Sequence, residues 1–168
     1  MLNSAVVAEF VPPRSEVADL GSGAGLPGVV LAILLPECRV KLVEPMARRT
    51  VFLAECVAEL ELENVEVVRG RAEDLAAEIS ADVVVSRAVA KLRQLAVLAA
   101  GLARPGGLVL AIKGAAAAEE VREAAPVLRR VAAGPAEVVS AGVGVLDQPT
   151  TIVRFITAAA RGKSARRG

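Results

Sequence analysis

Short apolar runs rich in valine alternate with longer amphipathic segments along the chain. The runs predict strands at residues 17–20, 40–43, 65–68, 82–85, 108–112, 136–139 and 151–157. The segments between them predict helices at residues 27–35, 48–60, 91–102 and 115–130. Because strands that alternate with helices build βαβ units, the pattern predicts an α/β fold with a doubly wound, mostly parallel sheet of about seven strands.

Three of these elements carry a more specific expectation. The uninterrupted run Val83–Val85 is typical of a strand that is buried on both faces. The helix at residues 48–60 is expected to bury an apolar face made of Val51, Phe52, Leu53, Cys56, Val57 and Leu60. The helix at residues 115–130 is expected to bend or break near Pro126, because proline lacks the N–H that a helix interior uses.

Length and composition narrow the chemistry. The 168 residues fit one domain, expected over residues 1–160, followed by a basic tail at residues 161–168. That tail is expected to be disordered, with an electrostatic RNA contact as the alternative. The chain contains no histidine, tyrosine or tryptophan and only three phenylalanines. It therefore lacks the commonest general base and zinc ligand, and neither a catalytic acid or base nor a metal site is expected.

The surroundings of the protein are predicted from equally simple features. Cys38 and Cys56 are expected to be small apolar residues rather than a disulfide, which suits a reducing compartment. No apolar run reaches about 18 residues without a charge or a proline, so no membrane span is expected. The first residues carry no basic leader. We therefore expect a cytoplasmic protein, and we expect it to be a monomer.

Four glycines in eight residues, from Gly21 to Gly28, follow the first predicted strand and precede the first long helix. Glycine lets a chain turn sharply from strand to helix and lets a ligand approach bare backbone. A ligand-binding turn is therefore predicted here. Gly23, Gly25 and Gly28 also satisfy the dinucleotide pattern G-x-G-x-x-G, so the spacing alone leaves a dinucleotide open.

Neighbouring residues favour S-adenosylmethionine (SAM) over a dinucleotide. Asp19 precedes the turn, where a carboxylate suits a ligand with a sulfonium and an amino group and repels a pyrophosphate. Glu44 ends the second strand and can accept ribose hydroxyls from either ligand. An acidic turn at residues 71–75 follows the third strand, where SAM-binding domains hold the adenine. The chain also leaves no room for the second domain of a dehydrogenase.

Basic residues recur at the ends of successive strands, where open α/β sheets bind their ligands. They are Arg48, Arg49, Arg69, Arg71, Arg87, Lys91 and Lys113. They predict an anionic substrate, with nucleic acid foremost, and the candidate substrate-binding residues are Arg48, Arg71, Arg87 and Lys113. The alternative is that they pair with nearby acids, as Arg87 could with Glu73. Since Arg87 follows three buried valines, its guanidinium is expected at the mouth of the site.

At these motifs the sequence resembles the RsmG (GidB) family, small-subunit ribosomal RNA methyltransferases that methylate guanine N7. The matching motifs are Leu2–Ser4, Asp19–Gly28, Glu44–Pro45 with Arg48–Arg49, Phe52–Leu53, Arg69–Glu73, Ser86–Val89, Lys113–Gly114 and Glu119–Glu120. The resemblance implies a Rossmann-like SAM-dependent fold and a 16S rRNA or small-subunit substrate. It also implies cofactor contacts at Gly21, Leu26, Ala72, Glu73 and Arg87. Together with the residues singled out above, the predicted cofactor set also includes Asp19, Gly23, Gly25 and Glu44.

The chain departs from the family pattern at its start. Family members carry a helical segment ahead of the Leu2–Ser4 motif, whereas here the motif opens the sequence. Leu2, Val6, Val7 and Phe10 are expected to be what remains of that packing layer. An alternative function follows from this departure, namely a SAM-binding module without methyltransferase activity.

Overall fold

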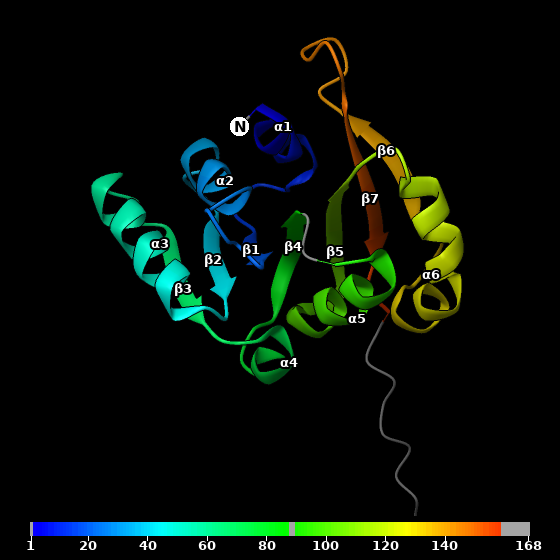
Figure 1. Ribbon diagram of the computed structural model, residues 1–168, viewed down its shortest axis with the longest axis horizontal. Coiled ribbons are helices and arrows are strands. Elements are labelled where there is room, and N and C mark those ends of the chain that lie inside the picture. The colour runs from blue at the N-terminus through cyan, green and yellow to red at the C-terminus, as the bar shows by residue number, and fades with distance from the viewer. Residues whose placement is uncertain (1, 88–89, 159–168) are drawn as a thin grey trace, which may run out of the picture.

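One seven-stranded sheet organises the described residues, 2–87 and 90–158, of this computed structural model (Figure 1). The strands are β1 (Glu16–Leu20), β2 (Arg39–Glu44), β3 (Val65–Arg69), β4 (Ala81–Arg87), β5 (Ala103–Lys113), β6 (Glu137–Ala141) and β7 (Thr150–Ile156). They lie in the order β3-β2-β1-β4-β5-β7-β6. β7 is antiparallel to both of its neighbours and the other pairs are parallel. The predicted α/β fold with a mostly parallel sheet is confirmed.

Helices cover both faces of this sheet (Figure 1). They are α1 (Leu2–Ala5), the 3-10 helix η1 (Val6–Phe10), α2 (Gly28–Leu34), α3 (Ala47–Glu59), α4 (Ala72–Leu75), α5 (Leu92–Leu102) and α6 (Ala117–Val131). One apolar cluster joins η1, α2 and α3 to one face, and a second joins α4, α5 and α6 to the other. Val83 and Val85 enter the first cluster and Val84 the second, so β4 is buried on both faces as predicted.

The buried face of α3 is narrower than its sequence predicts. Leu53 is completely buried and Val57 is half-buried, but Val51, Phe52 and Leu60 are 58%, 46% and 48% exposed. The reason is the position of the helix, which packs against β2 and the outermost strand β3. A helix near the rim of a sheet is covered along a thin stripe only, so the expected burial of these three side chains was wrong.

Two other elements differ from their predicted form. α6 continues through Pro126, so the expected break is absent, and a bend there stays a prediction. Pro126 faces solvent, so the carbonyl that loses its helical partner can bind water instead. β5 starts at Ala103 rather than near residue 108, and the turn-like segment 105–107 lies inside it as an irregularity in its pairing with β4. Gly106 supplies the positive φ of 76° that this irregularity needs.

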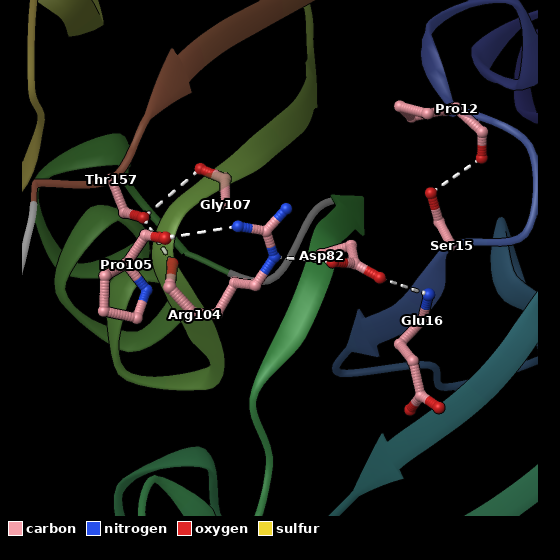
Figure 2. A network of polar contacts seen from close by, with 8 residues as sticks. All are labelled: Pro12, Ser15, Glu16, Asp82, Arg104, Pro105, Gly107 and Thr157. Atoms are coloured by element: carbon pink, nitrogen blue, oxygen red, sulfur yellow. Dashed lines mark hydrogen bonds and ion pairs between the residues drawn. The ribbon is translucent and has the colours of Figure 1, made fainter.

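A polar network joins strands at the amino ends of β1, β4 and β5 (Figure 2). The carboxylate of Asp82 accepts hydrogen bonds from the Glu16 main-chain N–H (2.8 Å) and from the Arg104 guanidinium. The Thr157 hydroxyl donates to the Arg104 carbonyl (2.7 Å). The Glu16 N–H, together with Arg104, lowers the pKa of Asp82 below its ordinary value. This network links the strands at the edge of the sheet where the parallel strands begin, opposite to the edge formed by their carboxyl ends.

The N-terminal segment forms part of the expected packing layer. Val7 is completely buried, and Val6 and Phe10 are half-buried. The guanidinium of Arg154 lies 5.7 Å from the centre of the Phe10 ring, within the range of a cation–π contact. Leu2 is 69% exposed, so the expectation that it is packed was wrong. The segment thus covers one face of the sheet from η1 rather than from its first residue.

Both cysteines are free thiols; Cys38 is buried and Cys56 is half-buried, as expected. No helix among the described residues is long and apolar enough to cross a membrane. Within the same residues, no group of three or more histidine, cysteine or acidic side chains could hold a metal ion. The predicted basic tail at residues 161–168 lies outside the described residues.

Candidate cofactor site

The glycine turn after β1 has a backbone that requires glycine at three positions. Gly21, Gly23 and Gly25 have φ values of 71°, 55° and 86°, in the region that other residues rarely adopt. The N–H of Gly21 donates to the carbonyl of Val43 on β2 (2.9 Å), which anchors the turn to the neighbouring strand. The turn therefore presents bare main chain at the carboxyl end of β1.

Asp19 lies completely buried beneath this turn. Its Oδ2 accepts a hydrogen bond from the N–H of Gly28 (3.0 Å), and its Oδ1 has no partner among the described residues. Burial raises the pKa of Asp19 to about 7, even though the Gly28 N–H and the charge of Arg87 act in the opposite direction. Gly28 has its own packing reason, because a Cβ there would come within 2.6 Å of Asp19 Oδ2.

Glu44, at the end of β2, is the second buried carboxylate and is 1% exposed. Its Oε2 accepts from the N–H of Gly23 and its Oε1 from the N–H of Met46, both at 3.0 Å. The guanidinium of Arg49 lies 3.7 Å from Oε2. An ionised carboxylate has about four acceptor positions, so Glu44 can hold the turn and still accept hydroxyl groups from a ligand.

A cavity of about 830 Å³ opens beside Glu44, whereas Asp19, which was predicted to contact the cofactor, is buried beneath the turn and does not line it. The cavity is lined by Gly21, Ser22, Gly23, Ala24, Leu26, Glu44, Pro45, Met46, Arg48, Arg49, Phe52 and Arg87. The glycine turn forms one wall and the start of α3 forms another, at the carboxyl ends of β1, β2 and β4. Of the predicted residues, Gly21, Gly23, Leu26, Glu44, Arg48 and Arg87 meet here. The size lies within the range of small-molecule sites.

The cavity carries charges of both signs: Glu44 lies at the glycine turn, whereas Arg48, Arg49 and Arg87 lie on the other parts of its lining. Two buried carboxylates, Asp19 and Glu44, lie at the glycine turn, and Asp19 has an unpartnered oxygen. A ligand with positive charge stabilises buried carboxylates, whereas an added anion is repelled by them. The residues present therefore fit a nucleoside that carries a sulfonium and an ammonium group. The two acids disfavour a pyrophosphate at the turn itself, and the arginines suit an anionic group such as the methionine carboxylate.

Several predicted residues lie outside the cavity lining. Gly25 is inside the turn, where its φ is needed. Arg71 precedes α4, Ala72 is buried in that helix, and Glu73 is exposed on it. Their roles in binding cofactor or RNA stay predictions. The ion pair between Arg87 and Glu73, which the sequence left open, is absent from the ion pairs formed by the described residues.

Lys113 ends β5 but has protein partners. Its side chain is 9% exposed. The ammonium group donates to Glu120 Oε2 and to the carbonyl of Ala90, both at 2.8 Å. Lys113 is thus directed between β5, α5 and α6, and its predicted contact with substrate stays a prediction.

Two cavity residues were not predicted to belong to a site. Phe52 was assigned to the core, and Met46 was given no role, yet both line the cavity. The spacing of four residues between Arg48 and Phe52 was an available signal, because residues four apart share a helix face. Since Arg48 was already expected at the site, Phe52 could have been placed there with it.

The family model for rRNA small subunit methyltransferase G (GidB) matches residues 1–143 of the chain. The chain belongs to this family. It is 49% identical over 178 residues to ribosomal RNA small subunit methyltransferase G of Salinispora tropica, covering 99% of this chain and 74% of that protein. It is 53% identical over 154 residues to the protein of the same name from Thermobifida fusca, covering 92% of this chain and 65% of that protein.

Solved structures support the fold alone. A SAM dependent methyltransferase from Aquifex aeolicus superimposes with a TM-score of 0.66 at 20% sequence identity, covering 92% of this chain and 88% of that one. The predicted family and the Rossmann-like methyltransferase fold are therefore confirmed. The two family relatives extend beyond the part that this chain matches, by about a quarter to a third of their length.

Proposed function

We propose that this chain methylates N7 of a guanosine in the 16S RNA of the small ribosomal subunit, with SAM as the methyl donor. The observation that carries the proposal is the cavity, where a glycine turn and the buried Glu44 lie beside three arginines, with Asp19 buried beneath the turn. The names of the family relatives, ribosomal RNA small subunit methyltransferase G, support the substrate class. The proposed partner is the RNA alone or the assembled subunit, and the protein is expected to act as a cytoplasmic monomer.

The chain's own residues can hold the cofactor, which supplies an electrophilic methyl group on a cationic sulfur when it is bound. The main chain of the turn at Gly21 and Gly23 carries no side chains, which allows a ligand to approach closely. Glu44 accepts hydrogen bonds from the ribose hydroxyls, because its two bonds to main-chain N–H groups leave acceptor positions on both oxygens. Asp19 adds negative charge from beneath the turn when it is ionised, a form that a bound cation favours. Arg87, at the end of β4, is the candidate partner of the methionine carboxylate.

The target atom explains why a site of this composition is sufficient. Guanine N7 carries an in-plane lone pair and no proton, so its methylation needs no general base. The chain contains no histidine. Its residues would act by positioning, which can contribute several kcal/mol to a rate. Arg48 and Arg87 are proposed to bind phosphates or to stack on a base, because a donor placed on N7 would block the reacting lone pair.

The test compares two arginine variants in a methyl-transfer assay with unmodified small subunits and tritiated SAM. Arg87→Ala is expected to lower the turnover rate by about 10²-fold, since small displacements at a reacting site have effects of this size. Arg39→Ala is the matched control, because Arg39 begins β2 at the opposite edge and its side chain is 82% exposed. Undiminished transfer by Arg87→Ala, or equal loss in both variants, would contradict the assignment.

A further inference from the structure

A shielded ion pair joins three elements behind the cofactor cavity. Lys113, the last residue of β5, donates to Glu120 of α6 at 2.8 Å. Their side chains are 9% and 23% exposed. Each member also holds the main chain ahead of α5, because the Lys113 ammonium donates to the carbonyl of Ala90 and the Glu120 carboxylate accepts from the N–H of Leu92, both at 2.8 Å.

Arg87 pairs with Ile112 across β4 and β5, and Lys113 is the next residue of β5. Since successive residues of a strand point to opposite faces, the Lys113 side chain lies on the α5 and α6 face and the Arg87 side chain on the other, so the ion pair is linked to Arg87 through the main chain. The carbonyl that Lys113 holds, at Ala90, lies three residues beyond Arg87, and the N–H that Glu120 holds opens α5. The main chain that follows Arg87 is thus held by hydrogen bonds at two points, the carbonyl of Ala90 and the N–H of Leu92.

We propose that Lys113 and Glu120 are positioning residues, which fix the main chain at Ala90 and Leu92 and through it the place of Arg87, and do not contact RNA. An exposed lysine at a strand end would be free for a phosphate, but two of the three donor positions of this ammonium are filled by Glu120 and Ala90. A buried ion pair adds little net stability compared with apolar residues of the same size. What this pair adds is a defined geometry between β5, α5 and α6. The inference rests on the proposed function, in which Arg87 belongs to the cofactor site.

The experiment measures two affinities for Lys113→Met and Glu120→Gln in the full chain. The first is the Kd of S-adenosylhomocysteine by calorimetry, and the second is the Kd of 16S RNA as a function of salt concentration. Glu120→Gln is nearly isosteric, so it tests the same ion pair if Lys113→Met does not fold. Glu119→Gln is the matched control, because Glu119 is the preceding residue of the same helix and pairs with Arg122 on its exposed surface.

Lys113→Met and Glu120→Gln are each expected to displace Arg87 and thereby to weaken S-adenosylhomocysteine binding by about tenfold. An effect of this size is common when neighbouring groups are coupled. The salt dependence of RNA binding is expected to stay unchanged in both, and Glu119→Gln to match the wild type. Loss of a phosphate contact would instead lower the slope of log K against log salt by about 1 with cofactor affinity intact. That result, or a lower melting temperature with both affinities unchanged, would overturn the inference.

Failure of the proposed function has a different signature. A wild-type chain that binds no S-adenosylhomocysteine removes the cofactor site, and the positioning role falls with it. A wild-type chain that binds S-adenosylhomocysteine, together with variants that bind it equally well, removes the positioning role alone.

Discussion

Asp19 is a completely buried carboxylic acid, and its replacement by asparagine is expected to change how stability depends on pH. The folded pKa is about 7, against an ordinary value of 3.8. Between these values the folded state binds more protons than the unfolded state, so wild-type stability falls as pH rises through this window. The full difference corresponds to about 4 kcal/mol, and the part above pH 5 to about 3 kcal/mol.

Asp19→Asn removes this titration and keeps an acceptor for the N–H of Gly28. The new amide NH₂ takes the place of the unpartnered Oδ1 and costs about 1–3 kcal/mol if it finds no acceptor. The variant is therefore expected to be less stable than the wild type at pH 5 and at least as stable at pH 8. At pH 8, where the wild-type carboxylate is mostly ionised, the variant is also expected to bind SAM more weakly, because the negative charge beneath the turn is lost.

The assay is urea unfolding at pH 5 and pH 8, followed by circular dichroism at 222 nm because the chain has no tryptophan or tyrosine to report by fluorescence. The quantity compared is the difference in unfolding free energy between variant and wild type, which cancels the titration of all other groups. A difference that stays constant or shifts against the variant as pH rises would refute the reasoning about Asp19.

Two further substitutions test packing beneath the glycine turn and charge at the opposite edge of the sheet. Gly28→Ala places a methyl group within 2.6 Å of Asp19 Oδ2, so the unfolding free energy is expected to fall by about 1–3 kcal/mol; urea unfolding at the wild-type midpoint would contradict this. Asp82→Asn removes a carboxylate whose pKa is lowered by the Glu16 N–H and by Arg104. That stabilisation is present above the ordinary pKa of 3.8 and lost as pH falls through the lowered one, so the variant should melt earlier at pH 7, and its difference from the wild type should shrink as pH falls below 3.8.

The order of strands and helices could be predicted because burial imposes a pattern on the sequence. Val83–Val85 is apolar without interruption since helices cover both faces of β4. The early start of β5 could not be predicted, because segment 105–107 has the local chemistry of a turn. It belongs to the strand only through its pairing with β4, which sequence pattern does not reveal.

The exposed face of α3 shows a second limit. Val51, Phe52 and Leu60 recur with the spacing of a buried helix face. Their exposure follows from the place of α3 beside the outermost strand, a tertiary fact that the spacing does not contain. As a result Phe52 was assigned to the core, although it lies on the wall of the cavity.

The cofactor site divides in the same way. The glycine turn and Glu44 could be predicted, because both directly follow or end a predicted strand and their positions depend on the local backbone alone. The direction of a charged side chain could not be predicted. Arg87 and Lys113 both follow strands at one edge, yet Arg87 lines the cavity whereas Lys113 is held by Glu120 between helices. Asp19 likewise lies beneath the turn rather than on its surface.

The central claim is methyl transfer to guanine N7, and mapping the methylated nucleotide tests it most directly. Unmodified small subunits would be incubated with the wild-type chain and tritiated SAM, and their RNA would then be reduced and treated with aniline, which cuts at 7-methylguanosine. The account predicts label in the small-subunit RNA and a single cleavage site. Bound SAM without transfer, or label on RNA that aniline does not cut, would contradict it.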